Sequence, residues 1–217
     1  PTLDAWTPEQ GDEPYIPEGG ALAPPGAYSV TAAKRVDGQL TRLGEPQVFE
    51  VYSIVKPTLE GSSPGEAFAF NRAVDSLEGQ VSAANAQIDA GLERVTAIRS
   101  VLLRTGDADP TLGERAYTIG KALADLKDRL GGNAMRAMAN DPGTLSVGAR
   151  LFHAGLGRVL STYGPTQGNA MSLRLAENAF ADIADELDTL DGQLGDIEAA
   201  LDAAGAPWTP GRSAVTQ

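Results

Sequence analysis

The chain has 217 residues, of which 42% are apolar, and it carries a formal net charge of -12 with no cysteine and a single histidine. This charge opposes binding to nucleic acid and insertion at an anionic membrane, because a phosphate backbone requires a concentrated basic patch. The lack of cysteine excludes disulfides and thiolate metal sites, and no stretch approaches the ~20 apolar residues of a membrane span. The apolar content is nevertheless enough for a buried core.

Residues 1–57 are predicted to form an extended arm and a partial β module. The arm, up to about residue 25, is rich in proline, glycine and acidic residues without periodicity, and its first residue, Pro1, indicates a processed chain or an excised fragment. An alternating segment from Tyr28, the turn dipeptide Asp37-Gly38 and a second extended run, Gln47–Val55, predict two or three antiparallel strands. An isolated hairpin is marginal in water, so we expect it to pack on the helices, on the arm or on strands outside this sequence.

Two long helices are predicted from apolar residues that recur alternately every three and four positions. The first begins between Pro64 and Ala67 and ends near Gly106, and the last closes at Gly205. At ~1.5 Å per residue each apolar stripe is about 45 to 50 Å long, so the two helices can share one seam. The predicted seam residues are Phe70, Leu77, Val81, Ile88, Val95, Ile98, Phe180, Ile183, Leu187, Leu190, Leu194, Ile197 and Leu201.

Two shorter helices are expected between the long ones. Asp109 caps the second helix, which weakens or ends at Gly131-Gly132 unless Met135 and Met138 continue it, and a glycine-interrupted third helix ends at Gly164. Short connections favour antiparallel neighbours. The predicted fold class is therefore mainly α: an antiparallel up-down four-helix bundle over residues 64–205, preceded by the β module and followed by a Pro/Trp tail, residues 206–217.

The chain offers little for catalysis or metal binding. His153 is the only histidine, and Ser146 or Ser161 would need it together with an orienting carboxylate, yet no G-x-S-x-G elbow is present. Asp107 and Asp109 lack the glycine and the closing glutamate of a calcium loop. We predict no catalytic residue, metal or cofactor. The acidic last helix has two interpretations, a solvated face partly neutralised by nearby basic residues or a docking face for a basic partner.

Three segments carry a family resemblance. Pro24–Val30, the turn Val36-Asp37-Gly38 and the return strand Phe49-Glu50-Val51 resemble the end of an immunoglobulin-like module in exported bacterial sortilin-like BNR-repeat β-propeller proteins. The closing Pro207-Trp208-Thr209-Pro210-Gly211-Arg212 is similar to the end of those chains, which are often labelled glycosyl hydrolases. The resemblance covers nearly all of this chain but only the C-terminal part of such a parent.

The resemblance implies a non-catalytic C-terminal docking or scaffold module of a secreted, periplasmic or envelope protein. Its partner would be the missing propeller of the parent, another protein or a second copy, and the candidate docking residues are Tyr28, Val30, Phe49, Val51 and Trp208. No catalytic residue carries over, because the propeller is not part of this sequence.

The alternative is a glycoside hydrolase or an accessory carbohydrate-binding domain with Trp6 and Trp208 near a cleft. A pocket lined by two carboxylates and an aromatic ring would favour this alternative. A filled helical core with its acidic residues facing solvent would favour the docking module.

Overall fold

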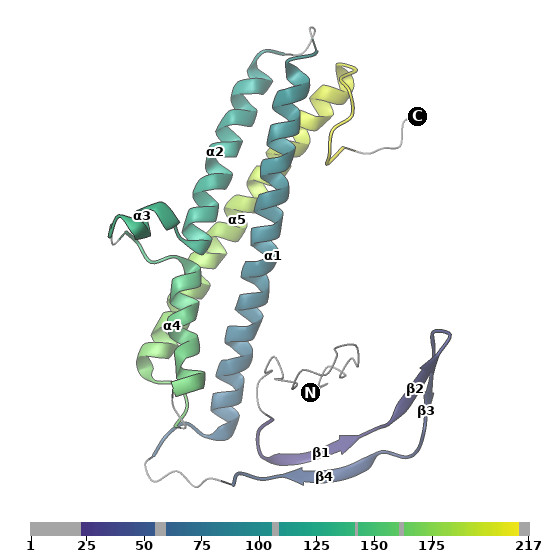
Figure 1. Ribbon diagram of the computed structural model, residues 1–217, viewed down its shortest axis with the longest axis vertical. Helices are drawn as coiled ribbons and strands as arrows, with labels where there is room; N and C mark the ends of the chain where they lie inside the picture. The colour runs from purple at the N-terminus through teal and green to yellow at the C-terminus, as the bar shows by residue number, and fades with distance from the viewer. Residues whose placement is uncertain (1–22, 55–59, 106–108, 142, 161–162, 213–217) are drawn as a thin grey trace. The chain divides into compact units, whose positions relative to one another are not determined.

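The computed structural model describes residues 23–54, 60–105, 109–141, 143–160 and 163–212. It is mainly helical, with two long helices packed against shorter ones and small antiparallel β hairpins before them (Figure 1). The chain divides into two compact units, Pro1–Val55 and Lys56–Gln217.

The first unit contains four short strands, β1 (Gly26–Val30), β2 (Ala33–Val36), β3 (Gln39–Arg42) and β4 (Gln47–Val51). They pair two by two along one ribbon. β1 pairs antiparallel with β4, and β2 pairs antiparallel with β3. The Leu43 N–H donates to the Ala32 carbonyl at 2.9 Å, which links the two ladders into one long hairpin. Asp37 and Gly38 have φ of 48° and 80°, as a tight primed turn requires, so the predicted turn is confirmed. The predicted arm and Trp6 lie outside the described residues.

The two long helices are α1 (Pro64–Leu102) and α5 (Gln167–Ala203). Each begins at a capping box: the Ser63 hydroxyl accepts from the Glu66 N–H at 3.2 Å, and the Thr166 hydroxyl accepts from the Asn169 N–H at 3.2 Å. The start predicted for α1 is confirmed, and its end lies a few residues before the predicted one. α5 stops just before Gly205, whose φ of +64° lies in the left-handed region.

The shorter helices are α2 (Thr111–Gly131), α3 (Ala134–Met138) and α4 (Val147–Leu160). The N-cap position of α2 is Pro110 rather than the predicted Asp109, but the Asp109 carboxylate still accepts from the N–H of the first helical residue, Thr111, at 2.8 Å. Of the two alternatives for the second helix, its end at Gly131-Gly132 is confirmed, and Met135 and Met138 do not continue it. Gly132 has a φ of +95°, which ends α2, and Asn133 then caps the separate α3 by accepting from the Arg136 N–H at 3.1 Å.

The predicted up-down-up-down order is also wrong, because α1 and α5 run parallel. Arg94, late in α1, binds Glu198, late in α5, while Leu77 and Phe180 line one groove near the helix starts. Figure 1 shows α2 and α4 end to end beside this pair. These two helices form one column, which runs antiparallel to α1 and α5. The connection at residues 132–146 is an excursion that includes α3 rather than a tight reversal, and the chain therefore resumes its former direction.

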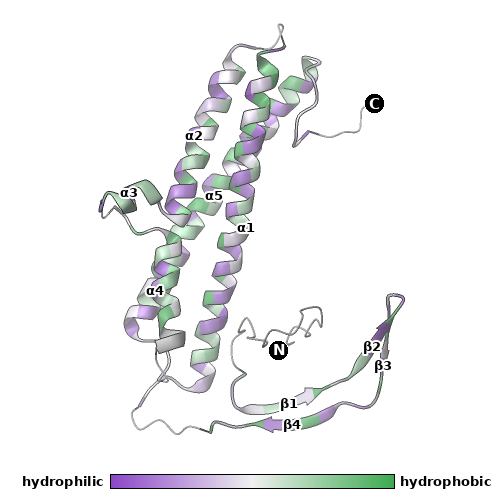
Figure 2. Cartoon of the chain, in the orientation of Figure 1, coloured by the Kyte–Doolittle hydropathy of each residue, from purple (hydrophilic) through white to green (hydrophobic). Residues whose placement is uncertain are grey.

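The core of the second unit lies between the two long helices and this column. All predicted seam residues belong to it: most are buried, and Phe70, Val81, Phe180 and Leu190 are partly buried against the others. The column adds Leu112, Ala116, Ile119, Leu123, Leu126, Leu130, Val147, Leu151 and Ala154. Figure 2 shows apolar residues alternating with polar ones along α1 and α5. The seam is therefore closed by three helical columns rather than by the two long helices alone.

The capping box of α1 predicts a pH-dependent stability. Hydrogen bonds from Ser63 hold the pKa of Glu66 below its ordinary value, and the Ser63 N–H donates to the Glu66 carboxylate at 2.7 Å. This stabilisation is fully present at neutral pH and is lost as the pH falls below about 4.3 and through the folded-state pKa. We expect Glu66→Gln to lower the unfolding midpoint at pH 7, with a smaller difference from the unsubstituted chain at pH 3. Urea titrations at both pH values test this, and an equal difference at both would contradict it.

Candidate functional site

The four docking residues predicted in the strands lie on one face of the ribbon. Tyr28 pairs with Phe49 and Gly26 with Val51, so the alternation of strand side chains places Tyr28, Val30, Phe49 and Val51 together. The Tyr28 and Phe49 rings are stacked with centroids 5.9 Å apart. Val30 is 55% exposed and Phe49 is 48% exposed. We call these four residues the ribbon face.

The opposite face and the edges of the ribbon complete this candidate surface. Ala27, Ser29, Val48 and Glu50 point to the other side, where Val48 is 77% exposed. β1 and β4 form a sheet of only two strands, and within the described residues their outer edges have no partner strand. Backbone N–H and C=O groups on such edges are able to pair with another chain.

The tail after α5 folds into a closed loop. The Trp208 indole N–H donates to the Arg212 carbonyl at 2.9 Å, while the Arg212 guanidinium donates to the Asp202 carboxylate at 2.7 Å and to the Ala206 carbonyl at 3.1 Å. Ala206 and Thr209 are buried, whereas Trp208 is 59% exposed. The Pro-Trp-Thr-Pro-Gly-Arg segment thus closes on itself beside the end of α5, and its tryptophan is fixed by a hydrogen bond while its ring remains accessible.

An ion network joins α1 and α5, and the tail packs against it. The Arg94 guanidinium donates two parallel hydrogen bonds to the Glu198 carboxylate, Nε–Oε1 at 2.8 Å and Nη2–Oε2 at 2.9 Å, and it also binds Asp191. The pKa of Arg94 is raised above its ordinary value, chiefly because Glu198 accepts these hydrogen bonds. Gly211 covers the pair: a Cβ at this position would lie 2.6 Å from Arg94 Nε, and its φ is +95°.

The sequence analysis does not predict this network, because it treats the acidic residues of the last helix as one face. The sequence does contain a sign of it: Glu198 is next to Ile197 and Arg94 is next to Val95, and both Ile197 and Val95 belong to the predicted seam. A charged residue next to a seam position lies at the border of the core, where a second charged residue can reach it. Glu198 is therefore a buried structural residue, unlike the exposed acidic residues around it.

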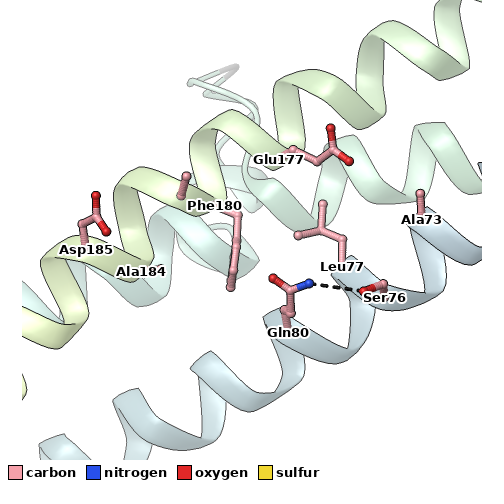
Figure 3. A pocket seen from close by; sticks show the side chains of 9 residues that line it. Ala73, Ser76, Leu77, Gln80, Glu177, Phe180, Ala184 and Asp185 are labelled. Atoms are coloured by element: carbon pink, nitrogen blue, oxygen red, sulfur yellow. Dashed lines mark hydrogen bonds between the residues drawn. The ribbon is translucent and has the colours of Figure 1, made fainter.

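An open groove lies between the first halves of α1 and α5 and has a volume of about 540 Å³. Figure 3 shows Leu77 and Phe180 pointing into the space between the helices, with Ser76 and Gln80 on α1 and Glu177 and Asp185 on α5. The remaining lining residues are Ala73, Ala181 and Ala184. We call this set of residues the α1–α5 groove.

The α1–α5 groove holds two carboxylates and an aromatic ring, the combination that would favour a glycoside hydrolase. Glu177 and Asp185, however, lie on one helix, and their separation in sequence corresponds to a rise of about 12 Å. The two carboxylates of a glycosidase face each other across the sugar, roughly 5 to 9.5 Å apart. The α1 side of the groove offers only a hydroxyl and an amide as polar groups. The groove has the residue types of such a site without opposed carboxylates.

The other candidate catalytic residues have local structural roles or lie outside the structure. The Ser146 hydroxyl accepts from the Ala149 N–H at 3.2 Å at the start of α4, His153 is exposed with its ring 6.0 Å from that of Phe152, and Ser161 lies outside the described residues. Within the described ranges, no three histidine, aspartate or glutamate side chains are grouped to hold a metal ion. Among the helices of the same ranges, none is both long and apolar enough to cross a bilayer.

Comparison of the chain with protein-family models, with curated proteins and with solved structures finds no match. The surfaces described above are therefore the basis for a functional proposal.

Proposed function

We propose that this chain is a non-catalytic docking and scaffold module that binds its partner through the ribbon face. The observation that carries the proposal is the exposure of Val30 and Phe49 on a sheet of two strands. A two-stranded ribbon is at best marginally stable in water, and it gains stability when its apolar face packs against another surface. Covering the ribbon face would remove this apolar area from solvent.

The helical unit supports a scaffold role for the rest of the chain. Its core is filled by leucine, isoleucine and valine from α1, α2, α4 and α5, while most acidic residues of α5 face solvent. The ion network and the closed tail add fixed contacts at the far ends of α1 and α5. A rigid helical unit joined to a ribbon with an exposed binding face is consistent with a module that holds other domains in place.

The proposed parent is an exported sortilin-like BNR-repeat propeller protein, secreted or retained in the periplasm or envelope. This part of the proposal rests on the resemblance of the ribbon and the tail to that family. In this view the ribbon is the last hairpin of an immunoglobulin-like module, and the surface that covers it is the upstream part of the parent. In isolation the ribbon face would pair with a second copy.

A second candidate function, a glycoside hydrolase or an accessory carbohydrate-binding domain, is favoured by the carboxylates and Phe180 of the α1–α5 groove. A panel of chromogenic glycosides tests it directly. The test variants are Glu177→Gln and Asp185→Asn, and the matched control is Asp182→Asn on the exposed side of α5. Turnover that the test variants lose and the control keeps would establish the hydrolase and contradict the docking proposal.

The docking proposal predicts self-association of the isolated chain through the ribbon face. We expect the sedimentation coefficient of the full chain to rise with concentration, because exposed edges and apolar strand faces pair with copies of themselves. Val30→Thr combined with Phe49→Thr should give a monomer, since threonine keeps a high strand propensity but removes apolar area. Val48→Thr, on the opposite face, is the control and should still associate. A chain that stays monomeric at every concentration would show that its own residues already cover the ribbon face.

A further inference from the structure

We propose that the α1–α5 groove is a second docking site, which takes a basic amphipathic helix of a partner protein. Two parallel helices form its walls, and the small side chains of Ala73, Ala181 and Ala184 leave room for the backbone of a third helix to approach. Phe180 is only partly buried and offers an apolar contact between the walls, while Leu77 beside it is buried (Figure 3). A helix that lies along a groove of this kind buries its apolar stripe against such residues.

The lining of the groove favours a helix over a small molecule. Small-molecule sites fix their ligand with a few convergent buried polar groups. Among the described residues, the buried side-chain polar atoms without a partner are Arg150 Nε and Thr209 Oγ1, and neither residue lines the groove. The polar residues that do line it stand on its rim, where they are open to solvent.

The charge of the rim determines the chemistry of the partner. Glu177 and Asp185 line the groove, and no Lys or Arg does so. Neither carboxylate has a hydrogen-bond or ion-pair partner among the described residues. Their separation along α5, about 12 Å, equals roughly two helical turns. Lys or Arg side chains seven or eight positions apart on the docked helix would therefore reach both carboxylates, while the residues between them would face Phe180.

The chain itself provides no segment of this chemistry. Residues 1–22 contain several acidic residues and no Lys or Arg, so the acidic rim would repel them. The apolar stripes of α1, α2 and α5 and the apolar residues Val147, Leu151 and Ala154 of α4 are buried in the core, and α3 is too short to fill the groove. Lys34, Arg35 and Arg42 are basic, but they lie on the strands β2 and β3. The occupant we propose is therefore a helix of another protein.

The test uses the full chain and a synthetic helical peptide of about 18 residues, with leucine and alanine on one face and lysines seven positions apart beside it. A matched peptide carries glutamate in place of lysine. We expect the lysine peptide to bind in fluorescence anisotropy at low salt, to bind about tenfold or more tightly than the glutamate peptide, and to weaken as salt is added.

Paired variants localise the binding to the groove. Glu177→Gln with Asp185→Asn should weaken the lysine peptide about three- to tenfold, whereas Asp182→Asn with Asp196→Asn removes the same charge from the same helix outside the groove and should have no effect. Ala181→Leu should weaken binding more than about tenfold by filling the groove, and the exposed Ala199→Leu should not.

Several results would overturn this proposal. They are the absence of lysine-peptide binding, equal effects of the two double variants, and binding that survives Ala181→Leu. Self-association of the chain that Ala181→Leu abolishes would also overturn it, because a second copy would then occupy the groove. The combined Val30→Thr and Phe49→Thr variant should bind the peptide normally. The two docking proposals can therefore fail separately.

Discussion

Ile88→Asp is expected to unfold the helical unit or to leave it only marginally stable. Ile88 is 0% exposed and lies in the core on α1. An unpaired buried carboxylate costs several kcal/mol, and the loss of the isoleucine side chain adds about 2 to 5 kcal/mol, against a total stability of about 5 to 15 kcal/mol. Leu187→Asp on α5 should act in the same way. Helical circular dichroism followed through a urea titration measures both variants.

The matched control for Ile88→Asp is Gln87→Asp, which introduces the same residue one position away on the exposed side of α1. Its free energy of unfolding should change by no more than about 0.5 kcal/mol, because exposed substitutions rarely do more. Equal urea midpoints for Ile88→Asp and Gln87→Asp would contradict the seam, and with it the packing of α1 described above.

Glu198→Gln is expected to have the second-largest effect, a loss of about 2 to 4 kcal/mol in the free energy of unfolding. The substitution removes the charge that accepts both Arg94 hydrogen bonds at 2.8 and 2.9 Å, and the side chains of Arg94 and Glu198 are largely buried. Asp191 still binds Arg94, so the loss should fall toward the lower end of this range. Urea titrations that give an unchanged slope and a lower midpoint would confirm it.

The matched control for this second prediction is Glu186→Gln on the same helix. Glu186 also pairs with an arginine, since Arg129 donates to its carboxylate at 2.7 Å, but both side chains are exposed and solvent screens the pair. We expect a loss below about 1 kcal/mol. A double replacement, Arg94→Leu with Glu198→Leu, should recover most of the stability lost in Glu198→Gln, because no buried charge then remains unpaired. Similar losses for Glu198→Gln and Glu186→Gln would show that the network does not stabilise the fold.

The local features of the fold follow from short stretches of sequence. Asp37 and Gly38 define the turn, Ser63 with Pro64 starts α1, and Gly205 follows the end of α5. Each of these depends on a few neighbouring residues, whose backbone preferences and side-chain hydrogen bonds act over one turn of chain. The spacing of apolar residues likewise identified the buried side of each long helix, because that side follows from the helical period alone.

Three features depend on long-range packing instead: the direction of α5 relative to α1, the burial of Glu198 and the α1–α5 groove. The excursion at residues 132–146 lets α4 continue in the direction of α2, and this places α5 parallel to α1. That arrangement brings Arg94 against Glu198 and Leu77 beside Phe180, residues about a hundred positions apart in sequence. Local preferences do not encode such pairings. Several helix arrangements would bury the same apolar stripes, and the free energy that distinguishes these arrangements comes from how the stripes pack against one another.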